Sequence, residues 1–140
     1  MYKAELISRY IINWCHKYDV DITNVKLQKL LYFLQGKYYK YVGKRLIRDD
    51  FYAWRLGPCV PDIYMDYSVY AGIIPKQRDI NTEIDHIELV NVILEQYAYF
   101  QTWYLVRRSC EEDPWKYTFQ IFGDKSRIPF QTIADYYVEM

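Results

Sequence analysis

The stretch that decides the fold runs from Ile22 to Tyr64 and reads ITNVKLQKLLYFLQGKYYKYVGKRLIRDDFYAWRLGPCVPDIY. Its first half predicts a long helix over residues 23–42. Thr23 is a good N-cap, because its hydroxyl can accept a free backbone N–H of the first helical turn. Gly43 is the expected end of the helix, since glycine adopts the left-handed conformation at low cost.

This helix has two faces of different character. Lysines interrupted by Phe33 make up one face, which predicts an exposed, solvated surface or a contact surface for an acidic partner. The members of that face are Lys26, Lys29, Lys37 and Lys40. The other face is apolar at helical spacing and is expected in the core: Leu27, Leu30, Leu31, Leu34, Tyr38 and Tyr41.

The second half of the stretch predicts a small β-ribbon and another helix. Residues 51–56 alternate in the manner of a short half-buried strand, and residues 45–47 are expected to pair with it across 48–50. Gly57-Pro58 is a strong break in regular structure. Pro61 suits the first turn of a helix, where its missing N–H costs little.

Outward from this stretch, further helices are expected over residues 3–18, from about 85, over 101–110, from about 114 to Gly123, and after Pro129. The sequence therefore predicts a mainly α protein with six to seven helices and a small two-stranded β-ribbon near residues 45–56. The 140 residues are expected to form one compact domain spanning 1–140.

Composition and charge favour a globular binding protein. Hydrophobic residues make up 51% of the chain and the net charge is zero, which argues against disorder and against global attraction to nucleic acid. Residues 1–48 nevertheless hold ten Lys or Arg against three Asp or Glu. Such an uneven distribution favours self-association or a charged partner, and the 17 tyrosines favour a protein interface.

Residues for catalysis or metal binding are scarce. There are two histidines, His16 and His86, and no spacing typical of a zinc site or a phosphate-binding loop. The adjacent pairs Asp49-Asp50 and Glu111-Glu112 are interpreted as solvated turns. The sequence thus predicts no enzyme, no metal and no cofactor.

Three unpatterned cysteines are typical of a reducing cytoplasm. No signal peptide or membrane-spanning stretch is predicted. A nucleic-acid-binding accessory protein that uses the basic helix 23–42 is the alternative function, because lysines and aromatic residues interleave there. We rank it second, since those tyrosines are needed for the inner face of the helix.

Three segments carry a resemblance to a known family. TNVKLQKLLYF (23–33), FYAWRLGPCVPDIY (51–64) and, more weakly, SCEEDPW (109–115) resemble motifs of the Panacea-domain family, which includes SocA-like antitoxins and phage-associated GepA-like proteins. In the third segment Cys110 stands where the family usually has histidine. The resemblance covers nearly the whole chain.

The resemblance implies an antitoxin that binds a toxin encoded beside it, with a phage or prophage association. A homo-oligomer is a further expectation, and one member of the family is an adaptor that delivers its toxin to a protease. The polar motif residues whose presence packing does not explain are the candidate partner-binding set: Lys26, Gln28, Lys29 and Arg55. The other motif residues are expected to serve the fold: Leu27, Leu30, Leu31, Tyr32, Trp54, Gly57, Pro58, Pro61, Tyr64, Pro114 and Trp115.

Overall fold

The structure, a computed structural model, describes all residues 1–140 and contains seven helices and three short strands. The helices are α1 (Ala4–Lys17), α2 (Asn24–Val42), α3 (Pro61–Tyr67), α4 (Ile87–Tyr97), α5 (Thr102–Glu111), α6 (Asp113–Phe122) and α7 (Phe130–Val138). The strands are β1 (Phe51–Trp54), β2 (Gly57–Cys59) and β3 (Ser126–Ile128). The mainly α prediction is confirmed. No helix is long and apolar enough to cross a membrane.

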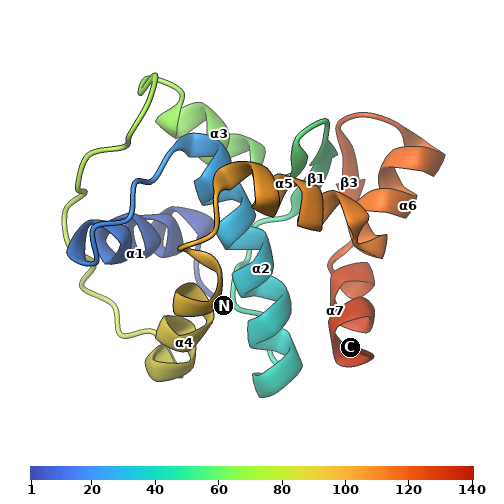
Figure 1. The fold of residues 1–140 in the computed structure, drawn as a ribbon. Coiled ribbons are helices and arrows are strands. Elements are labelled where there is room, and N and C mark those ends of the chain that lie inside the picture. Colours follow the sequence, from blue (N-terminus) through green and yellow to red (C-terminus); the bar gives the residue numbers. More distant parts are fainter.

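Helix α2 is the centre of the fold. In Figure 1 it stands between α1 and α4 on one side and α5 and α7 on the other, and it packs against all four. Its predicted ends are confirmed, because the Thr23 hydroxyl accepts the Lys26 N–H and Gly43 has a φ of 75°. Neighbours on every side bury the whole segment 26–36.

The exposed lysine face predicted for α2 is therefore wrong for the first half of the helix, whereas Lys37 and Lys40 in its second half are half-exposed. Lys26 and Lys29 are 7% and 2% exposed. Phe33, which was assigned to the same face, is completely buried. The reason is tertiary: a helix at the centre of a domain is covered on all sides, so its polar face lies against other elements instead of water. The periodicity of a single helix does not contain that information.

The sheet also differs from the expected ribbon. Its order is β2-β1-β3 and all pairs are antiparallel. Residues 55 and 56 form a two-residue turn between β1 and β2, and Trp54 lies opposite Gly57. Ile47, expected in the ribbon, instead bridges Tyr2. Gly57-Pro58 was interpreted as a break, but the tight hairpin places these residues in the edge strand β2.

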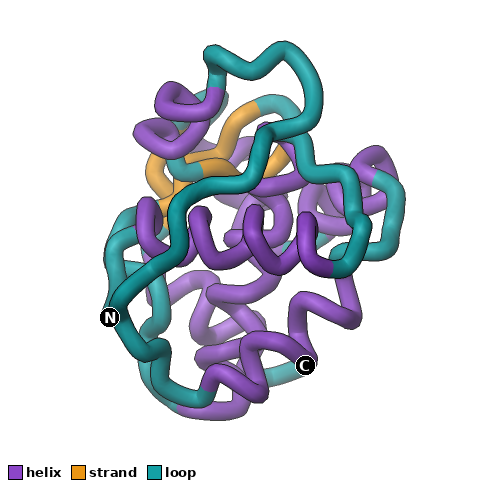
Figure 2. Tube along the Cα trace, turned by 90° about the vertical axis from the view of Figure 1, so that its left-hand side faces the viewer, coloured by secondary structure: helices purple, strands orange, loops and turns teal.

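The connection between α3 and α4, residues 68–86, is a long loop. Figure 2 shows it running over the outside of the molecule as a loop segment. One residue anchors it: Ile74 is completely buried, its N–H donates to Ile22 O at 2.8 Å, and its carbonyl lies 2.7 Å from His16 Nε2. The loop is thereby tied to α1 and to the start of α2.

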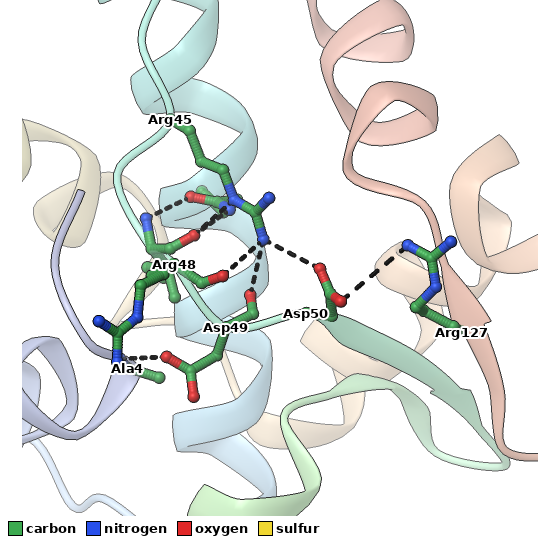
Figure 3. A network of polar contacts seen from close by, with 8 residues as sticks. Ala4, Arg45, Arg48, Asp49, Asp50 and Arg127 are labelled. Carbon is green, nitrogen blue, oxygen red and sulfur yellow. Dashed lines mark hydrogen bonds and ion pairs between the residues drawn. The ribbon is translucent and has the colours of Figure 1, made fainter.

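An arginine joins the end of α2 to the sheet (Figure 3). Arg45 donates to the backbone carbonyls of residues 47–49 and to the Asp50 carboxylate at 3.0 Å. The other Asp50 oxygen lies 4.0 Å from Arg127 on β3. These contacts hold the segment before β1 in a fixed path, so the hairpin that follows is set at a defined place beside α2.

Asp49 in the same segment caps α1, and this gives a first prediction. Its Oδ1 accepts the Ala4 N–H at 2.8 Å, which satisfies a donor that the first helical turn leaves free. Asp49→Ala is expected to lower the free energy of unfolding by about 1 kcal/mol, the usual contribution of such a cap. Asp49→Asn keeps an acceptor oxygen, so its free energy of unfolding, measured by chemical denaturation, should fall by less. Equal stability of wild type and Asp49→Ala would contradict the capping role.

Candidate functional site

The first two motif segments meet at one pocket. The first turns of α2, the β1–β2 hairpin, the start of α3 and the loop before β3 surround a cavity of about 210 Å³. Three of the four candidate partner-binding residues, Gln28, Lys29 and Arg55, line it. The fourth, Lys26, does not line it. Lys26 is buried elsewhere on α2, near Cys15, so the sequence-based set is only partly brought together.

Lys29 forms the floor of this pocket. Its side chain is almost completely buried, and its Nζ donates to Pro58 O at 2.9 Å. No carboxylate pairs with it. Burial lowers the pKa of Lys29 to about 8, and the neighbouring thiols of Cys59 and Cys110 oppose this shift. A buried cation without a counter-ion is costly, so this lysine is an unusual feature that folding alone does not require.

Gln28 connects the two motif segments. Its Nε2 donates to Asn24 Oδ1 at 3.2 Å, and its Oε1 accepts the Val60 N–H at 2.9 Å. The amide is thus largely occupied within the chain. Gln28 acts as a positioning residue that fixes the β2–α3 junction against α2, and we no longer place it among the direct partner contacts.

Gly57 lies directly against the Lys29 side chain. A Cβ at this position would be 3.0 Å from Lys29 Cε and 2.5 Å from Ser109 Oγ. The backbone also has a φ of 104°, which glycine adopts readily and other residues do not. The glycine of the second motif therefore lets the hairpin approach α2 and α5 closely enough to enclose the lysine.

An aromatic wall and two exposed cations complete the pocket. Trp54 and Tyr64 meet edge to face with their ring centroids 5.4 Å apart, and Lys125 Nζ lies 5.4 Å from the Trp54 ring. Arg55 is exposed in the hairpin turn. Neither Arg55 nor Lys125 makes an ion pair within the chain, and Asp124 is the only acidic residue of the lining.

The expected roles of the motif residues are partly corrected here. Trp54 at the end of β1 and Tyr64 on α3, both expected to serve the fold, are half-buried and line the pocket. Trp115 is also half-buried, and its Nε1 donates to Trp54 O at 2.7 Å. Pro61 is half-buried at the start of α3. The remaining structural candidates are buried as expected: Leu27, Leu30, Leu31, Tyr32, Gly57, Pro58 and Pro114.

The third motif segment contributes a second polar cluster, which sequence reasoning missed. Glu112 was interpreted as part of a solvated turn, but it is 3% exposed and accepts hydrogen bonds from Tyr32 at 2.8 Å and Tyr137 at 2.6 Å. Burial raises the pKa of the Glu112 carboxyl, and the two hydroxyls limit that rise. The partner from α7 lies 25 residues away, so no local pattern indicates this contact.

Removing one hydroxyl from this cluster gives a second prediction. Tyr137→Phe deprives a buried carboxylate of a donor and is expected to cost about 1–3 kcal/mol of stability. The loss should be larger at a pH where Glu112 is ionised than at a lower pH where it is protonated. The loss depends on pH in this direction because the Tyr137 hydroxyl stabilises the charged form of the Glu112 carboxyl. Denaturation of both proteins at several pH values checks it; a loss independent of pH would contradict the role of the charge.

A larger depression of about 590 Å³ lies elsewhere, between α1 and the loop around Asp79. None of its lining residues belongs to the three motif segments. Its charged residues include Lys17, Lys76 and Asp79. The pocket over Lys29 is the stronger candidate, because it combines motif residues with a buried unpaired cation.

Comparison with known proteins points to one family. The sequence model of the family described as antitoxin SocA-like, Panacea domain, matches residues 27–116. A similar curated protein is Antitoxin SocA from Caulobacter vibrioides (strain NA1000 / CB15N), which is 34% identical over 65 residues. That alignment covers 46% of this chain and 35% of the relative, so the chain matches about a third of its length. No solved structure matches the chain.

Proposed function

Because the chain belongs to the SocA-like antitoxin family with a Panacea domain, we propose that it is an antitoxin that neutralises a cognate protein toxin by binding it directly. The observation that carries this proposal is the pocket over Lys29. It joins the first two motif segments, its floor is an unpaired cation, and its rim is aromatic and exposed. A tryptophan, a tyrosine and an arginine at one site are the residue types that dominate protein interfaces.

In this proposal the protein acts by stoichiometric binding and not by catalysis. Burial raises the pKa of the Cys59 thiol to about 12 and also raises that of Cys110, so neither is a thiolate ready for attack at neutral pH. The two histidines line other depressions, away from the pocket over Lys29. The proposal also includes the cytoplasm as the place of action, in keeping with three free cysteines.

Three further roles belong to the same proposal: a phage or prophage association and delivery of the toxin to a protease, which rest on the family alone, and assembly into a homo-oligomer. For the last, exposed apolar residues on α6, such as Ile121 and Phe122, offer a surface of suitable chemistry.

The alternative function, nucleic-acid binding by the basic helix, is weakened by the packing of α2. Lys26 and Lys29 are buried, and Arg45 is engaged by Asp50 and by backbone carbonyls. Lys40 donates to Met140 O at the end of the chain. A continuous strip of free cations, which phosphate contacts need, is therefore missing from this helix.

A mobility-shift titration at physiological salt checks this alternative. We expect no complex tighter than about 1 μM with duplex or single-stranded DNA, because non-specific contacts alone give affinities of that order or weaker. A sub-micromolar complex whose affinity falls steeply with salt would restore the nucleic-acid function.

The experiment for the proposed function uses the gene next to this one. Its product is expressed as a candidate toxin, alone and together with increasing amounts of this protein, while growth and complex formation are recorded. Protection should increase with the amount of this protein, and the two proteins should copurify. Asp124→Asn, which removes the only acidic charge of the pocket lining, should bind at least as well as wild type. Growth without any complex would overturn direct binding.

A further inference from the structure

The pocket over Lys29 has an excess of positive charge that the chain itself does not neutralise. Lys29, Arg55 and Lys125 line it against a single carboxylate, that of Asp124, and none of the four takes part in an ion pair. The Lys29 ammonium has three donor hydrogens but only one acceptor within the chain, Pro58 O. A complementary occupant must therefore bring negative charge and hydrogen-bond acceptors.

The size and the walls of the pocket restrict that occupant further. A cavity of about 210 Å³ is smaller than the roughly 300–1,000 Å³ typical of small-molecule and cofactor sites. It suits one side chain better than a nucleotide. The Trp54 and Tyr64 rings form one wall, and Leu56, which is 49% exposed, lies in the hairpin turn with Arg55. This apolar surface is placed to contact residues that flank the charged group.

Resting on the proposed function, we propose that this pocket recognises an Asp or Glu side chain in an internal segment of the toxin. The carboxylate lies over the Lys29 ammonium, and apolar neighbours of that acidic residue pack on Trp54 and Leu56. The buried ammonium of Lys29 lowers the stability of the free protein. In the complex the same group then determines specificity. A charge-assisted hydrogen bond to Lys29 repays part of that cost only when the matching carboxylate is present.

Three short peptides probe this recognition by NMR with the ¹⁵N-labelled protein. They are acetyl-Leu-Glu-Leu-amide, its Gln counterpart, and acetyl-Leu-Leu with a free terminal carboxylate. The Glu peptide is expected to shift the amide signals of Lys29 and Gly57 and the indole signal of Trp54. The Gln peptide should bind roughly tenfold to hundredfold more weakly, the ratio for losing one charge-assisted hydrogen bond. Equal binding of Glu and Gln peptides, or no binding of either, would overturn the proposal. Preferential binding of the free terminus would overturn the side-chain assignment.

Variants separate the pocket from the fold. Lys29→Met removes the buried charge, and Arg55→Gln removes an exposed one that no packing depends on. Both substitutions should lower the affinity for the Glu peptide. Lys44 is exposed and does not line the pocket, so Lys44→Gln should leave that affinity unchanged. Retained affinity in Arg55→Gln and in a folded Lys29→Met would contradict the proposal.

The pH dependence offers an independent readout. The ammonium of Lys29 is faced by Cys59 on β2 and Cys110 on α5, while Arg55, Asp124 and Lys125 lie around the mouth. Since the pKa of Lys29 is about 8 in the free protein, affinity for the Glu peptide should begin to fall as the pH rises past that value. Lys29→Met should lack this fall. An identical pH profile in both proteins would contradict a role for the lysine charge.

The same variants distinguish this inference from the proposed function when the toxin is the ligand. Capture of the toxin by wild type and equally by all the pocket variants would refute the pocket and leave direct neutralisation intact. Binding of the Glu peptide together with no capture of the toxin would refute direct neutralisation and leave the pocket intact.

Discussion

Lys29→Met is expected to make the protein more stable and at the same time unable to bind its toxin. The burial that lowers the pKa of Lys29 from 10.5 to about 8 corresponds to a cost of about 3 kcal/mol at neutral pH, at 1.36 kcal/mol per pKa unit. Loss of the hydrogen bond to Pro58 O offsets part of the gain. We therefore expect a net increase of about 1–2 kcal/mol in the free energy of unfolding.

The pH dependence of stability checks the physical reason. The unfolded chain binds the Lys29 proton more tightly than the folded one, so this lysine contributes a rise in wild-type stability between about pH 8 and pH 10.5, in addition to the pH dependence that wild type and Lys29→Met share. Lys29→Met should lack that rise. Chemical denaturation of both proteins measures it, and capture of the toxin measures function. A Lys29→Met protein that is destabilised, or that still captures the toxin, would show that the lysine serves the fold instead.

Gly57→Ala is expected to be strongly destabilising although it adds only one methyl group. The new Cβ would meet Ser109 Oγ at 2.5 Å and Lys29 Cε at 3.0 Å, on a backbone with a φ of 104°. Backbone strain and overpacking each cost about 1–3 kcal/mol. The combined loss is therefore roughly 2–6 kcal/mol, and the displaced lysine should abolish recognition of the Glu peptide as well.

Two other glycines provide matched controls for this change. Gly43 also has a positive φ, of 75°, but nothing lies within 4 Å of its added Cβ, so Gly43→Ala measures the backbone cost alone. Gly72 has neither feature, and Gly72→Ala should be nearly neutral. Thermal denaturation orders the three variants. If Gly57→Ala lowered the melting temperature no more than Gly43→Ala does, the close approach of the hairpin to α2 and α5 would be refuted.

The parts of the fold that sequence reasoning predicted are those with local causes. Thr23 and Gly43 bound α2 because capping depends on residues within one turn. Pro61 begins α3 for the same kind of reason. The third strand was not predicted, because β3 pairs with β1 from 73 residues away in the register of Ser126 with Ala53, and its short segment has no pattern of its own.

The candidate site was predicted in composition but not in geometry. Lys29 was chosen because packing did not explain a lysine there, yet it was placed on the surface. Its burial depends on Gly57 and Pro58, which reach it only through the hairpin. A usable signal was present: Val25, Tyr32 and Phe33, which lie one helical turn from Lys29, are apolar or aromatic, which favours a helix covered on more than one side.

The most direct test of the account is a calorimetric titration of the purified product of the adjacent gene into this protein. Direct neutralisation predicts saturable binding tighter than about 1 μM, equivalent to about −8 kcal/mol, and a large loss of affinity in Arg55→Gln but not in Lys44→Gln. The account would be contradicted by cells that are protected from that product although the two purified proteins give no heat of binding and no complex.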